Sequence, residues 1–193
     1  MFDNEIVSIT NNDEIINKDG GIRPNTSHEI LDGLKLAFDE NGTVTAGTAS
    51  PLTDGASAVI VCEEEYAKKN NLNILARIKS TAVVGCPPEL MGLGPINASK
   101  KALKRANLSI SDIDIVELNE AFASQSLACI KELKMDINKV NIHGGAIALG
   151  HPLGATGARI TGKVATLLQN KNKKYGLATQ CIGLGQGLSL IHI

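Results

Sequence analysis

Asn141-Ile-His-Gly-Gly-Ala-Ile-Ala-Leu-Gly-His-Pro-Leu-Gly-Ala-Thr-Gly-Ala-Arg159 is the segment from which the architecture of this chain is best read. It contains five glycines, and glycine lets a backbone turn tightly and approach a ligand closely. His151 stands between glycine and proline, just before a predicted helix, where free backbone N–H groups can face an anion or a polarised oxygen. The pattern predicts a ligand-binding loop. The alternative is a structural loop that carries a solvent-exposed histidine.

Strand-like and helix-like segments alternate around this loop. The expected strands cover residues 74–84, 113–118, 140–142, 175–181 and 188–193. The expected helices cover residues 95–107, 120–133 and 158–169, and a glycine-rich turn over residues 183–187 joins the last two strands. Such alternation predicts a layered α/β domain over residues 71–193.

Residues 1–70 have a weaker pattern. Short strands are expected over residues 3–9 and around Val44, and a short helix over residues 63–69, whose acidic start favours a helix N-terminus. The stretch from Asn11 to His28 is polar and rich in turn residues, so it offers no core of its own. We expect these seventy residues to be the remnant of a larger unit.

Composition limits the function classes. The chain has 193 residues, 43% of them hydrophobic, which suffices for one globular domain or slightly more. Nineteen basic and twenty acidic residues leave no charge surplus for binding nucleic acid or an anionic membrane. No apolar run is long enough to span a membrane, and the first residues lack the basic region followed by an apolar region that is typical of a secretory signal. We therefore expect a soluble, cytoplasmic protein. The four cysteines are widely spaced, which indicates free thiols rather than a metal site or disulfides.

Two further segments can carry chemistry. Cys181 ends a predicted strand and opens a turn without bulky side chains, so its thiol can act as an acid or base if a neighbour shifts its pKa. An inert small hydrophobe is the commoner role of such a cysteine. Asn119 begins the segment Asn119-Glu-Ala-Phe122 between a strand and a helix. Its amide could hold a water or a carbonyl, and the default expectation is that it caps the helix.

Taken together, these segments resemble the thiolase family. Thiolases carry an N-E-A-F segment, a G-G-A-I-A-x-G-H-P-x-G-x-[ST]-G-x-R loop and a C-x-G-x-G turn in this order, and all three stand intact here. Met91-Gly-Leu-Gly-Pro95 and Thr45-Ala-Gly-Thr-Ala-Ser50 are similar to two further stretches of that family. The resemblance runs from near Phe2 to near Leu188. It implies a mixed β-sheet flanked by helices, present here as a C-terminal part plus a remnant of the N-terminal domain.

The resemblance also implies a thioester-exchange site. His151 would activate a nucleophilic thiol, and Cys181 would move a proton on the substrate. Asn119 would orient a water that forms one oxyanion hole with His151, and the backbone N–H of Gly183 would serve a second. The remaining implied positions line the coenzyme A channel or lie near its nucleotide end: Ser50, Phe38, Met91, Phe122 and Arg23. Coenzyme A and acetyl-CoA would be substrates, with no covalent cofactor and no metal.

One catalytic group has no counterpart in this chain. In thiolases a different cysteine, in the first half of the protein, carries the acyl group, and no segment around Cys62, Cys86 or Cys129 resembles that motif. We therefore expect an acetyl-CoA acetyltransferase-like thiolase fragment that is inactive alone and assembles as a homo-oligomer when complete. A non-catalytic coenzyme A-binding or scaffold module is the alternative. Leu184 replaces a common glycine of the last turn and is expected to tighten the pocket.

Basic residues of the predicted helix over residues 95–107 allow two interpretations. They could face the phosphates of coenzyme A, although a solvated helix face is the more ordinary role. The residues concerned are Lys100, Lys101, Lys104 and Arg105.

Overall fold

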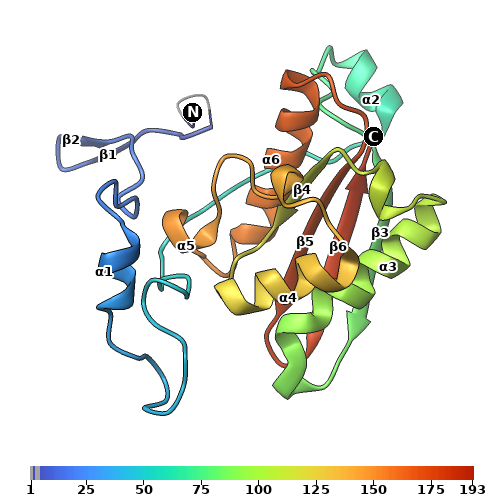
Figure 1. Ribbon diagram of the computed structural model, residues 1–193. Helices are drawn as coiled ribbons and strands as arrows, with labels where there is room; N and C mark the ends of the chain where they lie inside the picture. Colours follow the sequence, from blue (N-terminus) through green and yellow to red (C-terminus); the bar gives the residue numbers. More distant parts are fainter. Residues whose placement is uncertain (1, 3–4) are drawn as a thin grey trace.

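The computed structural model describes residue 2 and residues 5–193 (Figure 1). Its centre is a four-stranded sheet in the order β3 (Ile78–Gly85), β6 (Gln186–His192), β5 (Gly176–Ile182) and β4 (Ile115–Leu118). β4 runs parallel to β5, whereas β6 is antiparallel to both of its neighbours. The expected mixed sheet is confirmed.

Helices cover both faces of this sheet (Figure 1). α3 (Gly94–Ala106) and α4 (Ala123–Leu133) lie on one face, and α6 (Thr156–Asn170) lies on the other. The strand residues alternate accordingly. Val116 and Leu118 of β4 join the core under α3 and α4, whereas Ile115 packs with the apolar side of α6. Among the helices of the described residues, none combines the length and apolar character of a membrane span.

Short helical turns connect the main elements. They are η1 (Pro88–Leu93), η2 (Ile110–Asp112), η3 (Ile137–Lys139) and α5 (Ala146–Leu149). α5 lies inside the glycine-rich loop and ends at Gly150, whose φ of +97° is a conformation that favours glycine. The loop thus reaches His151 through one helical turn and a reversal of the backbone.

Several expected boundaries are wrong for identifiable reasons. The strand expected over residues 74–84 runs from Ile78 to Gly85, and its pairing reaches one residue further, because Arg77 exchanges two backbone hydrogen bonds with Ile193. The helix expected from residue 120 begins at Ala123, because Ala121 and Phe122 contact residues 49–50, including the bridge between Ala49 and Phe122. The strand expected over residues 140–142 is reduced to one bridge, between Val140 and Val116. β6 begins two residues earlier than expected, at Gln186, and ends at His192.

Residues 5–70 lie beside the α/β body, in the blue to cyan part of Figure 1. They form a small hairpin of β1 (Ile9–Asn11) and β2 (Glu14–Ile16), followed by α1 (His28–Asp32) and α2 (Glu64–Lys69). The strand expected over residues 3–9 thus begins at its last residue, and residues 3–4 lie outside the described part. Around Val44 there is one isolated bridge instead of a strand. Of the described residues in this region, only Ala49 and Ala67 are buried.

Candidate active site

His151 is held at the end of the glycine-rich loop by the segment around Thr53. Its backbone N–H donates to the Thr53 hydroxyl at 3.2 Å. A side chain at Gly150 would collide with Thr53, so the loop can approach this segment only with glycine at that position. Four positions further on in both segments, the Ser57 hydroxyl donates to the Ala155 carbonyl oxygen at 2.5 Å. Residues 53–57 therefore run along residues 150–155 and fix the histidine backbone.

The imidazole of His151 is oriented by Thr156. Its Nδ1 lies 2.7 Å from the Thr156 hydroxyl, and that hydroxyl donates to the Pro152 carbonyl oxygen at 3.1 Å. Since the hydroxyl has a single proton, its oxygen accepts from Nδ1–H, and the lone pair of His151 stands on Nε2. Nε2 is therefore the basic atom of the ring.

Asn119 presents its amide to that atom. Its Nδ2 lies 3.2 Å from Nε2 of His151, and its backbone N–H donates to the Thr179 carbonyl oxygen at 3.0 Å. The side chain is buried, and its Oδ1 has no hydrogen-bond partner among the described residues. The default expectation that Asn119 caps a helix is wrong, because α4 begins four residues later at Ala123. The amide instead faces the histidine.

Cys181 lies at the same edge of the sheet as Asn119. β4 and β5 are parallel, and Leu118 lies opposite Thr179. The residues that follow Leu118 and Thr179 therefore leave the sheet at the same end. Cys181 is buried near the end of β5, opposite Gly187 of β6. The following turn leaves Gly183 exposed, and the Leu184 side chain is 91% exposed. The expectation that Leu184 tightens the pocket is therefore wrong for this chain, because its side chain points to solvent.

Burial shifts the pKa values of His151 and Cys181 in opposite directions. Desolvation lowers the pKa of His151, and the charge of Arg159 lowers it further. Desolvation raises the pKa of Cys181, with a smaller contribution from Cys86 that acts in the same direction. At neutral pH the site therefore offers a neutral imidazole that can accept a proton and a thiol that can donate one.

Three of the residues expected along a coenzyme A channel lie together. Ser50 donates its hydroxyl to the Ala121 carbonyl oxygen at 3.1 Å, beside the bridge between Ala49 and Phe122. The rings of Phe38 and Phe122 meet edge to face, with centroids 6.1 Å apart. Phe38 is 85% exposed and has a left-handed backbone, so its ring is available to a ligand.

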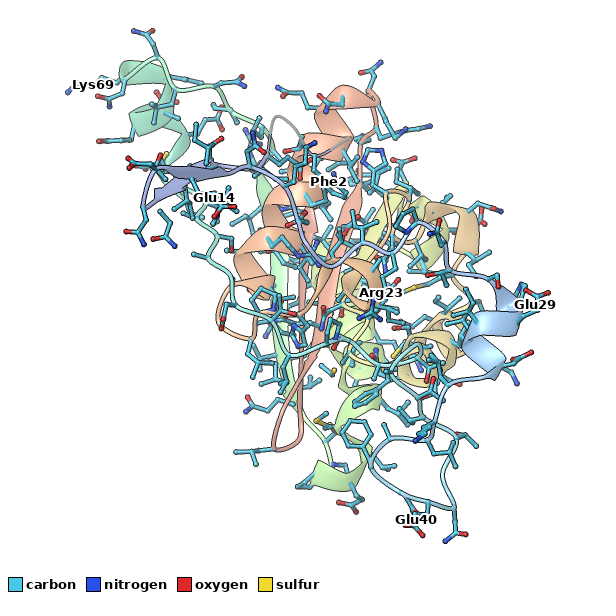
Figure 2. The ribbon with its side chains drawn as sticks, turned by 90° about the vertical axis from the view of Figure 1, so that its left-hand side faces the viewer. Phe2, Glu14, Arg23, Glu29, Glu40 and Lys69 are labelled. Carbon is cyan, nitrogen blue, oxygen red and sulfur yellow. The ribbon has the colours of Figure 1, made fainter. Side chains whose placement is uncertain are left out.

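Met91 and Arg23 lie in other segments. Met91 is half-buried in η1, and the next residue, Gly92, accepts a weak hydrogen bond from the Cys129 thiol. Arg23 is exposed, on the part of the chain that runs from the hairpin to α1 across the body (Figure 2). A Cβ at the nearby Gly21 would lie 2.9 Å from the Ala148 carbonyl oxygen, so this segment passes along α5.

Three of the four basic residues of α3 named above make contacts within the protein. Lys100 pairs with Glu132 of α4 at 3.1 Å. Lys101 and Arg105 donate to backbone carbonyl oxygens of β3, at Val83 and Thr81. These contacts favour an ordinary helix face over a phosphate site.

The sequence did not reveal two residues of this site. Thr53 lies outside any helix, strand or turn and carries no motif, so nothing in the sequence marks it as a partner of His151. Thr156 lies inside the glycine-rich loop, five residues after the histidine, and its place before a predicted helix was the available signal. Both become recognisable only through their hydrogen bonds to the histidine.

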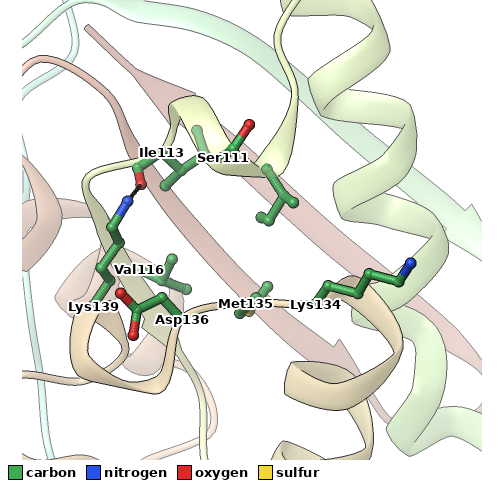
Figure 3. Close-up of a pocket in the computed structure, with 8 residues that line it drawn as sticks. Ser111, Ile113, Val116, Lys134, Met135, Asp136 and Lys139 are labelled. Carbon is green, nitrogen blue, oxygen red and sulfur yellow. Dashed lines mark hydrogen bonds between the residues drawn. The ribbon is translucent and has the colours of Figure 1, made fainter.

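Two surface cavities lie elsewhere. One of about 230 Å³ opens between η2 and the end of α4, where Lys139 donates to the Ile113 carbonyl oxygen at 2.8 Å (Figure 3). The other, of about 550 Å³, lies between η1, α3 and α4 and includes Cys86. Neither contains Asn119, His151 or Cys181.

Comparison with known proteins identifies the class to which this fold and site belong. The family model of the thiolase C-terminal domain matches residues 72–193, and that of the thiolase N-terminal domain matches residues 1–65. The chain belongs to the thiolase family.

Individual relatives agree with this assignment. The 3-ketoacyl-CoA thiolase of Vibrio vulnificus (strain YJ016) is 56% identical over 180 residues, which cover 91% of this chain and 46% of the relative. The crystal structure of human mitochondrial 3-ketoacyl-CoA thiolase in complex with CoA is 48% identical, with a TM-score of 0.92 over 96% of this chain and 47% of that one. The dimeric peroxisomal thiolase of Saccharomyces cerevisiae is 47% identical, with a TM-score of 0.93 over 100% and 49%. The chain spans about half the length of the relatives it matches.

Proposed function

We propose that this chain supplies the C-terminal part of a thiolase that forms or cleaves 3-ketoacyl-CoA by thioester Claisen chemistry. The observation that carries the proposal is the 3.2 Å approach of Asn119 Nδ2 to His151 Nε2, at the sheet edge where Cys181 lies near the end of β5. On this reading residues 1–70 belong to the N-terminal domain and residues 71–193 form the C-terminal domain. The names of the relatives support 3-ketoacyl-CoA thiolase activity, and we propose acetyl-CoA as the two-carbon substrate or product.

His151 acts first as a base. Its neutral Nε2 takes the proton of the attacking thiol, and the resulting imidazolium donates Nε2–H toward the developing oxyanion. Asn119 keeps a water in place through its free Oδ1, and this water donates to the same oxygen. In cleavage, the thiol of Cys181 gives its proton to the α-carbon of the departing acetyl-CoA enolate. In synthesis the thiolate of Cys181 removes that proton again.

The acyl group is carried by a cysteine outside these 193 residues. Cys129, in the middle of α4, does not have the surroundings of an activated nucleophile. Burial raises the pKa of the Cys129 thiol to about 11, which disfavours the thiolate. We therefore propose that the isolated chain does not turn over 3-ketoacyl-CoA, because a proton shuttle without an acyl carrier cannot complete the exchange.

The partner of this chain is the other half of the thiolase. The apolar segment over residues 56–62 forms neither helix nor strand here, and Ile60 and Val61 are 83% and 68% exposed. An exposed run of this kind is typical of a surface that packs on a partner. The complete protein is proposed to assemble as a homo-oligomer, in keeping with the dimeric yeast relative.

The test uses a fused protein, in which the part of the Vibrio vulnificus thiolase that precedes the matched region is joined to this chain. We expect thiolysis of acetoacetyl-CoA and longer 3-ketoacyl-CoA substrates by the fused protein and none by the isolated chain. His151→Ala and Cys181→Ala should each abolish thiolysis by the fused protein. A folded fused protein that binds coenzyme A without turnover would support the scaffold alternative instead.

A further inference from the structure

Glu120 stands directly after Asn119 and contacts the beginning of the glycine-rich loop. Its Oε1 accepts from the Asn141 side-chain amide at 2.8 Å, and its Oε2 accepts from the backbone N–H of Ile147 at 3.2 Å. An ionised carboxylate offers only acceptors, so both of its oxygens are matched to donors. The residue thus connects the end of β4 to two separate points of the loop.

Asn141 strengthens this connection. Its Oδ1 accepts from the Leu118 N–H at 2.9 Å, and its Nδ2 donates to the Leu118 carbonyl oxygen at 2.8 Å. The side chain therefore occupies the place that a neighbouring strand would have beside Leu118. The backbone of Asn141 has a φ of +46°, a left-handed conformation that asparagine tolerates better than most residues. The same amide that binds Glu120 is thereby fixed to the strand.

Gly145 shows how closely the carboxylate fits. A Cβ built at this glycine would overlap the Glu120 carboxyl group. The φ of Gly145 is −133°, so backbone strain does not require glycine here. The requirement is space for the carboxylate of Glu120.

These contacts hold one end of the segment that leads to His151. Ile147 precedes the histidine by four residues, and Thr53 and Thr156 hold the other end. The spacing between Asn119 and His151 is therefore set from both sides. We propose that Glu120 is a positioning residue that, together with Asn141, sets the distance between the Asn119 amide and the His151 ring. This inference rests on the thioester-exchange function proposed above.

The test is Glu120→Gln in the fused protein. Glutamine turns an NH₂ group toward one of two donors, the Asn141 amide or the Ile147 N–H, so one contact becomes repulsive. We expect kcat to fall about tenfold or more, with the KM for coenzyme A unchanged within about twofold. Glu132→Gln is the matched control, since it makes the same chemical change on the exposed surface of α4 and should leave kcat unchanged.

A double-mutant cycle separates positioning from a general loss of stability. If Glu120 acts through the pair of Asn119 and His151, then Asn119→Ala already removes most of its effect. Adding Glu120→Gln should then lower kcat by less than twofold further. Additive losses in the double variant, or a change in KM alone, would overturn the proposal.

Two further measurements keep the test independent of folding and of turnover. Gly145→Ala displaces the carboxylate without removing it and should reproduce the fall in kcat, so it carries the test if Glu120→Gln does not fold. The NMR signal of the His151 ring should shift in both variants but not in Glu132→Gln. An unshifted ring signal would overturn the positioning role, whereas an unsubstituted fused protein without activity would contradict the proposed function alone.

Discussion

The backbone N–H of His151 donates to the hydroxyl of Thr53, a residue 98 positions earlier in the chain, at 3.2 Å. This bond ties the end of the glycine-rich loop to a segment that belongs to the N-terminal family match. The histidine that Asn119 faces is therefore positioned by residues from both parts of the chain.

Thr53→Val should weaken this attachment. Valine keeps the shape of threonine but offers no acceptor, so the half-buried N–H of His151 loses its partner. We expect a loss of about 1 kcal/mol in the free energy of unfolding and a several-fold fall in kcat of the fused protein. Thr53→Ser keeps the hydroxyl and serves as control. Equal kcat values for the valine variant and the parent would show that this bond does not position the ring.

Thr156→Val should disturb the imidazole itself. Without the hydroxyl, Nδ1–H has no acceptor and the tautomer with the lone pair on Nε2 is no longer favoured. We expect kcat to fall about 10- to 100-fold, the scale on which a misoriented general base costs rate. Nitrogen NMR of the ring reports the tautomer directly. Thr156→Ser should retain the parent tautomer, and a valine variant with that same tautomer would contradict the assignment of Nε2 as the basic atom.

The acid limb of the pH dependence of kcat/KM should lie below pH 6.5, the ordinary pKa of histidine. Burial and the charge of Arg159 both lower the pKa of His151, so the neutral base persists to lower pH. Arg159→Gln removes the second cause and leaves the first, so the limb should move upward while staying below pH 6.5. An acid limb that moves to lower pH in Arg159→Gln, or that lies above pH 6.5 in the parent, would contradict a lowered pKa of His151.

Glu117 should make stability depend on pH. Burial raises the pKa of its carboxyl group to about 7 from an ordinary value of 4.5, against the opposing charges of Arg159 and Lys163. Between these values the folded state keeps a proton that the unfolded state has lost, so stability falls as pH rises through this window. The total is about 3 kcal/mol.

Glu117→Gln removes this titration. The difference in the free energy of unfolding between variant and parent, measured by urea at several pH values, should therefore rise in favour of the variant by about 3 kcal/mol from pH 4.5 to pH 8. Taking this difference cancels the titration of the histidines. A difference that stays constant with pH would refute the raised pKa.

Leu184→Gly should stabilise the protein. Leu184 has a φ of +67° and a side chain 91% exposed, so it bears the cost of a left-handed backbone without burying its side chain. Relief of this strain exceeds the added chain entropy of glycine, and we expect a gain of about 0.5–1 kcal/mol. Leu153→Gly, at a residue 78% exposed and without a positive φ, should destabilise and is the matched control. Equal effects at both positions would argue against strain at Leu184.

Much of the architecture follows from local pattern. The apolar alternation of residues 113–118 and the helical periodicity of residues 158–169 each correspond to an element of the structure, β4 and α6. Where an expected boundary differs from the observed one, backbone pairing with another segment of the chain decides it. Residues 74–77 have the composition of a strand, but of these four residues only Arg77 pairs with the last strand, through two backbone hydrogen bonds to Ile193. Residues 120–122 suit a helix, but the backbone groups of residues 121–123 pair with residues 48–50.

The sequence by itself determined the family, the glycine-rich loop and the chemical character of His151, Cys181 and Asn119, because residue type and close spacing are written along the chain. Only the tertiary structure decided that the Asn119 amide lies directly against the His151 ring, that Thr53 and Thr156 hold that histidine, and that Glu120 fills the space beside Gly145. Hydrogen bonds between segments 20 to 100 residues apart depend on how strands and loops pack, and no local pattern encodes that packing.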